Sequence, residues 1–124
     1  MPRFHHVNLG IPPDEEDAEI GFLVDVLGYR RIDPGEALAS MGALWFEGED
    51  GGQIHLSRDA DHRPAAKAHV AVEYADDLDR VGQKLREAGQ EVDRRQFAEG
   101  PEVLICLDPA GNRWELRARP VSSV

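Results

Sequence analysis

Alternating apolar and polar residues predict a first set of elements in the order β-α-β-β-β. Alternation with a period of two marks four strands, at residues 4–11, 29–32, 42–47 and 53–57. Between the first two strands, helical spacing marks one helix by Ile20, Leu23, Val24 and Leu27. Asp14 is the expected N-cap of this helix, and Gly28 is its expected end.

The same order of elements returns in the second half of the chain. Strands are predicted at residues 68–74, 90–94, 103–107 and 111–117. The helix opens at Asp76-Asp77, and its apolar face is formed by Leu78, Val81, Leu85 and Ala88. The offset between the copies falls from 63 residues at His6 and His69 to 60 at His55 and Glu115. Such a repeat predicts two βαβββ modules of the α+β class.

A polar segment separates the copies and reads as a linker. It covers about residues 59–66, which leaves module one at about 3–58 and module two at about 67–119. Modules of this length would be only marginally stable alone, because so short a chain buries a small fraction of its surface. We therefore expect one domain over residues 1–124, in which the modules pack on each other or on a second subunit.

Charge and composition exclude several classes of partner. The formal net charge is −10, which argues against nucleic-acid phosphates and anionic membranes as partners. No stretch of 18 apolar residues and no apolar signal segment is present, so a cytoplasmic location is expected. The one cysteine, Cys106, excludes a disulfide framework within the chain.

Strand parity places four potential metal ligands on equivalent faces of the two modules. If Val7 and Leu9 face a helix, His6 faces away from it, and His69 follows the same rule in module two. His55 and Glu115 alternate with apolar residues in the last strand of each module. Three imidazoles and a carboxylate are ordinary ligands of Zn²⁺, Ni²⁺, Fe²⁺ or Mn²⁺.

Other polar and aromatic residues share these faces and are candidates for binding a substrate. Arg113 and Arg117 lie beside Glu115 and could hold a carboxylate or phosphate, or could instead pair with acids such as Glu47 or Glu73. Asn8 shares the face of His6 and is a further candidate. Trp45 is expected either to line the site or to belong to the core.

Three residues with suitable chemistry are expected to lie outside the site. His5 has the wrong parity and is expected to be structural or exposed. His62 lies in the linker and is expected to be a solvated surface residue, unless it reaches the site of a partner subunit. Glu73 could act as a base, but an exposed carboxylate at a strand end is the simpler interpretation.

The chain resembles the vicinal oxygen chelate superfamily, which includes glyoxalase I, extradiol dioxygenases, and fosfomycin- and bleomycin-resistance proteins. The resemblance rests on four segments: Phe4-His5-His6-Val7-Asn8-Leu9, Val26-Leu27-Gly28-Tyr29, Ala68-His69-Val70-Ala71-Val72, and Asp108-Pro109-Ala110-Gly111-Asn112-Arg113-Trp114-Glu115-Leu116. It implies paired βαβββ modules that form a cup-shaped mixed sheet with the helices outside, often in a homodimer. It also implies a divalent metal ion held at His6, His55, His69 and Glu115, which chelates two adjacent oxygens of a small substrate.

One position departs from the family pattern. Isomerases of this superfamily usually carry Glu or Gln where this chain has His55, and the Glu is linked to proton transfer in glyoxalase I. The resemblance to ring-cleaving enzymes requires only the positions of His6, His69 and Glu115. The tyrosine and cation-binding loop of the fosfomycin-type thiol transferases are not found around Phe97 to Leu107.

These observations favour a metal-dependent isomerase or lyase in which Glu115 or His55 transfers the proton. An Fe²⁺-dependent extradiol-type dioxygenase is the alternative within the enzymes. A metal-free cup that sequesters a cationic antibiotic or a metabolite is the alternative from another class, and a metal-binding module without catalysis is a third.

Overall fold

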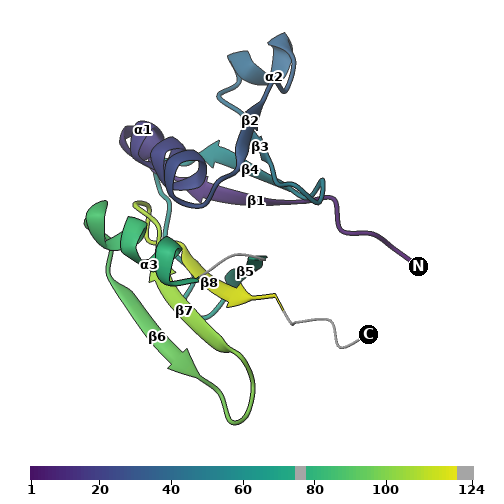
Figure 1. Cartoon of the computed structure of the whole chain (residues 1–124). Helices are drawn as coiled ribbons and strands as arrows, with labels where there is room; N and C mark the ends of the chain where they lie inside the picture. Colours follow the sequence, from purple (N-terminus) through teal and green to yellow (C-terminus); the bar gives the residue numbers. More distant parts are fainter. Residues whose placement is uncertain (75–77, 120–124) are drawn as a thin grey trace. The chain divides into compact units, whose positions relative to one another are not determined.

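The structure is a computed structural model, and it describes residues 1–74 and 78–119 (Figure 1). Spatial proximity along the backbone divides the chain into unit 1, residues 1–63, and unit 2, residues 64–124. Each unit contains one four-stranded mixed sheet and accompanying helices. The predicted α+β class is confirmed.

Unit 1 follows the predicted order with one addition. Its strands are β1 (His6–Ile11), β2 (Arg30–Ile32), β3 (Leu44–Glu47) and β4 (Gln53–Arg58), in the sheet order β1-β4-β3-β2. Its helical segments are η1 (Pro13–Glu15), α1 (Glu16–Gly21), η2 (Phe22–Val26) and the additional helix α2 (Glu36–Ser40). Strands β1 and β4 are parallel, whereas the other neighbours are antiparallel.

Unit 2 repeats this topology. Its elements are β5 (His69–Tyr74), α3 (Leu78–Glu87), β6 (Val92–Gln96), β7 (Glu102–Leu107) and β8 (Arg113–Ala118), and the sheet order is β5-β8-β7-β6. Here too the first and last strands pair in parallel, and the others pair antiparallel. The register is also equivalent, because β1 pairs His6 with Gln53 and β5 pairs His69 with Arg113.

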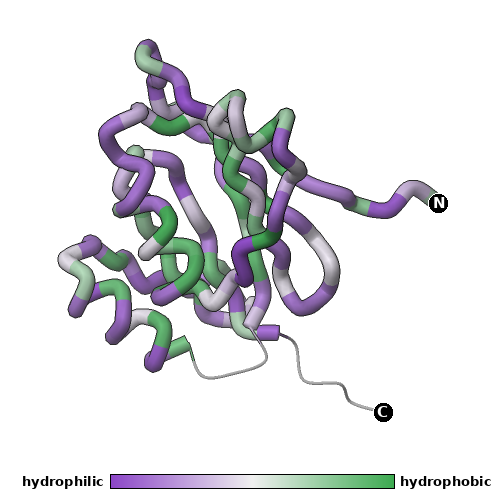
Figure 2. The backbone as a smooth tube through the Cα atoms, turned by 90° about the horizontal axis from the view of Figure 1, so that it is seen from above, coloured by the Kyte–Doolittle hydropathy of each residue, from purple (hydrophilic) through white to green (hydrophobic). Residues whose placement is uncertain are grey.

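Each sheet buries the face that its alternation makes apolar. In unit 1, Phe46, Ile54 and Leu56 are buried, as are Phe22 and Leu23 of the helical segment that Figure 1 shows beside β1 and β4. In unit 2, the buried set includes Leu85, Leu104, Trp114 and Leu116. Helix α3 approaches β7 so closely that a Cβ added at Gly82 would lie 3.3 Å from Leu104 Cδ1. Figure 2 shows α3, which follows the grey trace, changing between hydrophilic and hydrophobic colours, as an amphipathic helix does.

The start of the first helix differs from the prediction. Asp14 does not cap it, since neither η1 nor α1 has a side-chain capping bond, and the segment instead begins as a tight turn at Pro13. The segment ends in the wider η2 turn, where the Leu27 amide donates to the Phe22 carbonyl at 3.0 Å. Gly28, with φ of +90°, ends the helix as predicted.

In unit 2, one strand lies two residues later than predicted. Strand β6 occupies Val92–Gln96 rather than residues 90–94. Arg94 of β6 forms ion pairs with Asp79 of α3 and Glu102 of β7, which tie this polar edge strand to its neighbours. The predicted helix start at Asp76-Asp77 lies outside the described residues.

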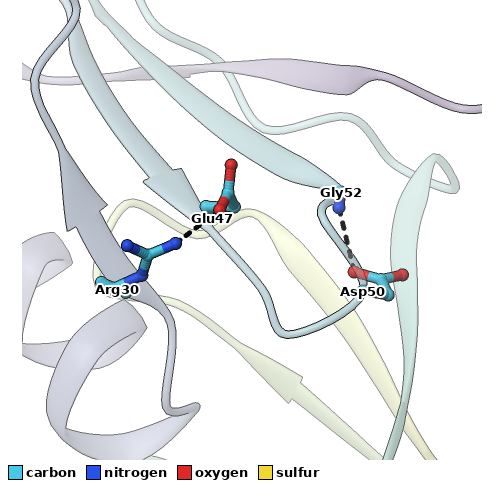
Figure 3. A network of polar contacts seen from close by, with 4 residues as sticks. All are labelled: Arg30, Glu47, Asp50 and Gly52. Carbon is cyan, nitrogen blue, oxygen red and sulfur yellow. Dashed lines mark hydrogen bonds and ion pairs between the residues drawn. The ribbon is translucent and has the colours of Figure 1, made fainter.

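The turn from β3 to β4 leads into the strand that carries His55. Arg30 of β2 forms an ion pair with Glu47 of β3, with 2.5 Å between Nη2 and Oε1, and this pair lies next to the turn (Figure 3). Within the turn, the Asp50 carboxylate accepts a hydrogen bond from the Gly52 amide at 3.0 Å. Such a carboxylate-to-amide bond fixes a short turn, and it thereby fixes where β4 begins.

Candidate metal and substrate site

The four predicted ligands occupy two equivalent diagonals, one in each unit. His6 pairs in register with Gln53, and His55 stands two residues further along the same strand. His69 pairs with Arg113, and Glu115 likewise stands two residues further along. Diagonal neighbours on one sheet face are within reach of each other. The repeat therefore gives each unit one half-site of two ligand-type residues.

In unit 1 the diagonal brings the two imidazoles into direct contact. The ring centroids of His6 and His55 are 4.0 Å apart with 16° between the planes, and Trp45 stacks on the other side of His55 at 4.1 Å and 1°. His55 is only 7% exposed, although it lies on the polar face of β4. Trp45 is thus a wall of the half-site and covers one face of His55.

Stacking and burial change the chemistry of His55. Desolvation, and then the nearby His6 and His5, lower the pKa of His55 from 6.5 to about 4. The ring is therefore neutral near pH 7, which is the form that binds metal ions. His55 is one of the two residues predicted to transfer the proton, and a pKa of about 4 makes it a weak proton acceptor near neutral pH.

Gln53 was not among the predicted site residues, yet it orients His55. Its side-chain oxygen lies 2.8 Å from His55 Nε2, so this nitrogen carries the proton and the lone pair is on Nδ1. The sequence held one signal for it, since Gln53 shares the strand face of His55 at a spacing of two residues.

His5 is exposed, as expected, and it also contacts His6. His5 Nδ1 lies 2.8 Å from His6 Nδ1, and the two rings meet edge to face with centroids 5.1 Å apart. One of these nitrogens must donate and the other accept. If His6 Nδ1 donates, His6 Nε2 has the lone pair that a metal ion needs, which makes His5 an orienting partner.

The half-site of unit 2 combines an imidazole with a carboxylate. His69 Nδ1 lies 3.0 Å from the Lys67 carbonyl, which can only accept, so the proton is on Nδ1 and the lone pair is on Nε2. Glu115 Oε2 forms an ion pair with Arg117 Nη1 at 3.0 Å. Arg117 thus pairs with Glu115 itself rather than with Glu47 or Glu73, and it holds the carboxylate in one orientation.

The turn before β8 fixes the strand that carries Glu115. Asp108, 3% exposed, accepts hydrogen bonds through Oδ1 from the amides of Ala110 at 3.0 Å and Asn112 at 2.9 Å. Its Oδ2 accepts a bond from Trp114 Nε1 at 3.1 Å. Trp114 precedes Glu115 directly, so one buried carboxylate sets the start and the facing of this strand. The sequence marked Asp108 only as part of a turn signal.

The remaining candidates have different surroundings. Asn8 accepts a hydrogen bond from the Ser57 hydroxyl at 2.8 Å on the exposed face of β1. Arg113 has no ion pair among the described residues. His62 is not fully solvated as expected, because its ring packs on Gly10, where an added Cβ would lie 3.0 Å from His62 Nδ1.

Comparison with known proteins identifies the family. The model of the Glyoxalase/Bleomycin resistance protein/Dioxygenase superfamily matches residues 3–116, nearly the whole chain. The chain belongs to this superfamily. A comparison with curated proteins found no match.

Solved structures of superfamily proteins share the fold. A protein from Bacillus anthracis, described as a member of the glyoxalase family, is 26% identical, with 97% of each chain covered and a TM-score of 0.85. The fosfomycin resistance protein FosX from Listeria monocytogenes is 15% identical, with 98% of this chain and 96% of that chain covered and a TM-score of 0.79. A glyoxalase/dioxygenase from Nostoc punctiforme is 19% identical, with coverages of 96% and 92% and a TM-score of 0.76. The latter two, at this identity, show the fold alone.

The donor types suit the divalent metal ion that the superfamily implies, whereas the geometry of unit 1 suits it only in part. Imidazoles and a carboxylate fit Zn²⁺, Ni²⁺, Fe²⁺ or Mn²⁺. Within residues 1–74 and 78–119, however, no group of three His, Cys, Asp or Glu side chains converges. Imidazole lone pairs lie in the plane of the ring, and the planes of His6 and His55 are nearly parallel with centroids 4.0 Å apart, so the two rings could bind one ion only after one of them rotates.

No helix within residues 1–74 and 78–119 is long and apolar enough to cross a membrane.

Proposed function

We propose that this superfamily member is a divalent-metal-dependent enzyme of the vicinal oxygen chelate type. It acts on a small substrate with two adjacent oxygens, and isomerase or lyase chemistry is the preferred reaction. The observation that carries the proposal is the pair of equivalent diagonals, His6 with His55 and His69 with Glu115, in two sheets of identical topology and register. A repeat has no structural need for ligand-type residues at both diagonals.

In this proposal the two half-sites bind one metal ion, within one chain or between two copies of it. His69 would bind through Nε2 and His55 through Nδ1, as their hydrogen bonds dictate. Three neutral imidazoles and one carboxylate leave a divalent ion with a charge of +1, which favours an anionic oxygen ligand. When bound, the ion would supply Lewis-acid polarisation of the substrate oxygens.

The proton-transfer role falls to Glu115 rather than His55. Arg117 Nη1 lies 3.0 Å from Oε2 of Glu115 and orients the carboxylate, the group type that can accept a proton from a substrate. His55, with its pKa near 4, is assigned to metal binding alone. Asn8, Trp45 and Arg113 are proposed to contact the substrate.

The stack around His55 distinguishes this proposal from the dioxygenase alternative. A ring-cleaving enzyme would need only His6, His69 and Glu115 and would leave the fourth position unconstrained. Here Trp45 covers one face of His55, and Gln53 fixes its Nε2. That degree of orientation is expected of a ligand. The binding-protein alternative is favoured by the near-parallel rings of His6 and His55, which suit a stacking surface better than a shared ion.

Metal titration followed by unfolding tests the proposal. Protein stripped of metal should gain thermal stability on addition of Zn²⁺, Ni²⁺, Mn²⁺ or, under anaerobic conditions, Fe²⁺, because an ion bound only by the folded state stabilises it. His69→Ala should remove the gain, and His62→Ala should keep it. No gain with any of the four ions would favour the metal-free binding protein. Consumption of O₂ by the Fe²⁺-loaded protein with catechols would instead support the dioxygenase reaction over the isomerase reaction. The expected homodimer and cytoplasmic location remain predictions.

A further inference from the structure

Unit 2 contains a groove that includes Arg113, a proposed substrate contact, but none of the four proposed metal ligands. It has a volume of about 560 Å³ and lies where the end of α3 meets β6, β7 and the start of β8. Small-molecule sites have volumes of this order, roughly 300–1,000 Å³. We name it the arginine groove, because Arg86, Arg95 and Arg113 all line it.

The charges of the groove oppose those of the whole chain. Three arginines face two carboxylates, Glu91 and Asp93, so the groove has an excess of one positive charge in a chain of net charge −10. Asp93 is already engaged, because its Oδ2 accepts from Arg95 Nε at 2.6 Å. Among the described residues, neither Arg86 nor Arg113 has an ion pair. Two guanidinium groups are thus available to an anion.

The surface next to Arg113 is apolar. Ile105 and Leu107 share one face of β7 and line the groove, and Leu107 is 53% exposed. In register, Leu107 lies directly opposite Arg113 on β8. An exposed aliphatic surface beside a planar guanidinium suits a ligand with an apolar body and an anionic end.

The groove also has a defined relation to the half-site of unit 2. Arg113 and Glu115 are two residues apart on one strand, so their side chains share a sheet face about 6–7 Å apart along the strand. A ligand held by Arg113 would therefore extend alongside the carboxylate proposed to bind metal.

We propose that the arginine groove binds the carboxylate end of an amphipathic small molecule. Arg113 and Arg86 hold the carboxylate, and Ile105 and Leu107 contact the apolar body. The further assignment of this molecule as the substrate rests on the proposed function, and it defines the substrate class as apolar carboxylates that carry two adjacent oxygens.

Binding of a matched pair of probes tests the groove independently of the metal. The full-length chain, stripped of metal with a chelator, is titrated by calorimetry with 2-naphthoate and with 2-naphthamide, its uncharged isostere. The naphthoate should bind at least about tenfold more tightly, because a hydrogen-bonded charge is lost in the amide. Arg113→Gln and Arg86→Gln should each weaken the naphthoate by about 5- to 30-fold and leave the amide unchanged.

The control variant is Arg80→Gln, which removes the same charge from an exposed position on α3 outside the groove. It should change naphthoate binding by less than about twofold, as expected for a distant, screened charge. An equal loss in Arg80→Gln, equal affinity for the two probes, or no binding of the naphthoate would overturn the proposal. If Arg113→Gln fails to fold, Arg113→Lys replaces it in the test, because lysine keeps the positive charge but lacks the planar guanidinium group that binds a carboxylate through two hydrogen bonds. Because the probes are titrated into metal-free protein, a protein that binds no metal would still give these results. The proposed groove and the proposed metal-dependent function can therefore be refuted independently.

Discussion

Substitution of Asp108 tests how the strand that carries Glu115 is held. The carboxylate accepts three hydrogen bonds, two from turn amides and one from Trp114 Nε1, and both Asp108 and Trp114 are almost fully buried. A buried donor that loses its acceptor costs about 1–3 kcal/mol. Asp108→Ala removes the acceptor of all three bonds, so the free energy of unfolding should fall by about 3–5 kcal/mol, less than the full sum because such terms are not additive.

The conservative variant Asp108→Asn separates the turn from the indole. Its side-chain oxygen can still accept from the two amides, but its NH₂ group then faces the N–H of Trp114. We expect a loss of about 1.5–3 kcal/mol. Trp114→Phe removes that N–H, so it should cost about 1–2 kcal/mol less in the Asp108→Asn background than in the natural protein.

Urea unfolding of the four proteins of this cycle is the assay, with the slope of the transition checked for constancy. Asp50→Asn is the matched control, because its carboxylate accepts one bond from Gly52 in an exposed turn (Figure 3). It should change the free energy of unfolding by less than about 0.5 kcal/mol. Additive effects of Asp108→Asn and Trp114→Phe would refute the coupling through Oδ2.

Three further predictions concern the two half-sites and the turn. The pKa of His55 falls from 6.5 in the unfolded chain to about 4 in the folded one, so metal-free protein should lose at most about 3 kcal/mol of stability as the pH falls from 6.5 through 4. Urea midpoints from pH 7 to pH 4 measure this, and a pH dependence that His55→Gln does not reduce contradicts it. Gly111 has a φ of +86°, and a Cβ added there would lie 2.8 Å from the Pro64 side chain, so Gly111→Ala should lower the free energy of unfolding by more than about 2 kcal/mol. Gly89 has a φ of +82° but open space around it, so Gly89→Ala should lower it by only about 1 kcal/mol. Equal melting temperatures for the two variants would rule out the clash with Pro64. If His5 orients His6, His5→Ala should weaken Zn²⁺ binding by about tenfold, and His5→Gln should weaken it less. Calorimetric titration with Zn²⁺ measures both affinities, and an unchanged affinity in His5→Ala would show that the contact has no such role.

The alternating strands and the repeat were predictable because they depend on local residue type. Glycines such as Gly28 and Gly111 end elements at positive φ, as their sequence context indicated. The repeat then fixes an equivalent register, which is why parity alone placed His6 near His55. Helix α2 escaped prediction because Glu36–Ser40 is a single turn, too short for a helical period. Strand β6 was misplaced because the charged run Asp93-Arg94-Arg95 has no alternation.

The details of the site depend on side-chain conformations that no residue pattern encodes. Whether His5 meets His6, and whether Gln53 meets His55, is decided by rotamers and by neighbours on other strands. The pKa of His55 depends on its burial and then on the nearby His6 and His5, and the stack with Trp45 of β3 depends on the side-chain conformations of both residues. Sequence patterns therefore identify the ligand types, whereas tautomer, burial and ion pairing require the structure.

The metal content of natively purified protein tests the central claim most directly. Elemental analysis should find about one divalent ion per chain, as a site of four protein ligands requires. His69→Ala and Glu115→Ala should lose the ion while remaining folded by circular dichroism, and Glu73→Gln, on the same face of β5 as His69, should retain it. Protein purified without any divalent ion, and unable to take one up from Zn²⁺, Ni²⁺, Mn²⁺ or Fe²⁺, would contradict the proposed metal-dependent enzyme.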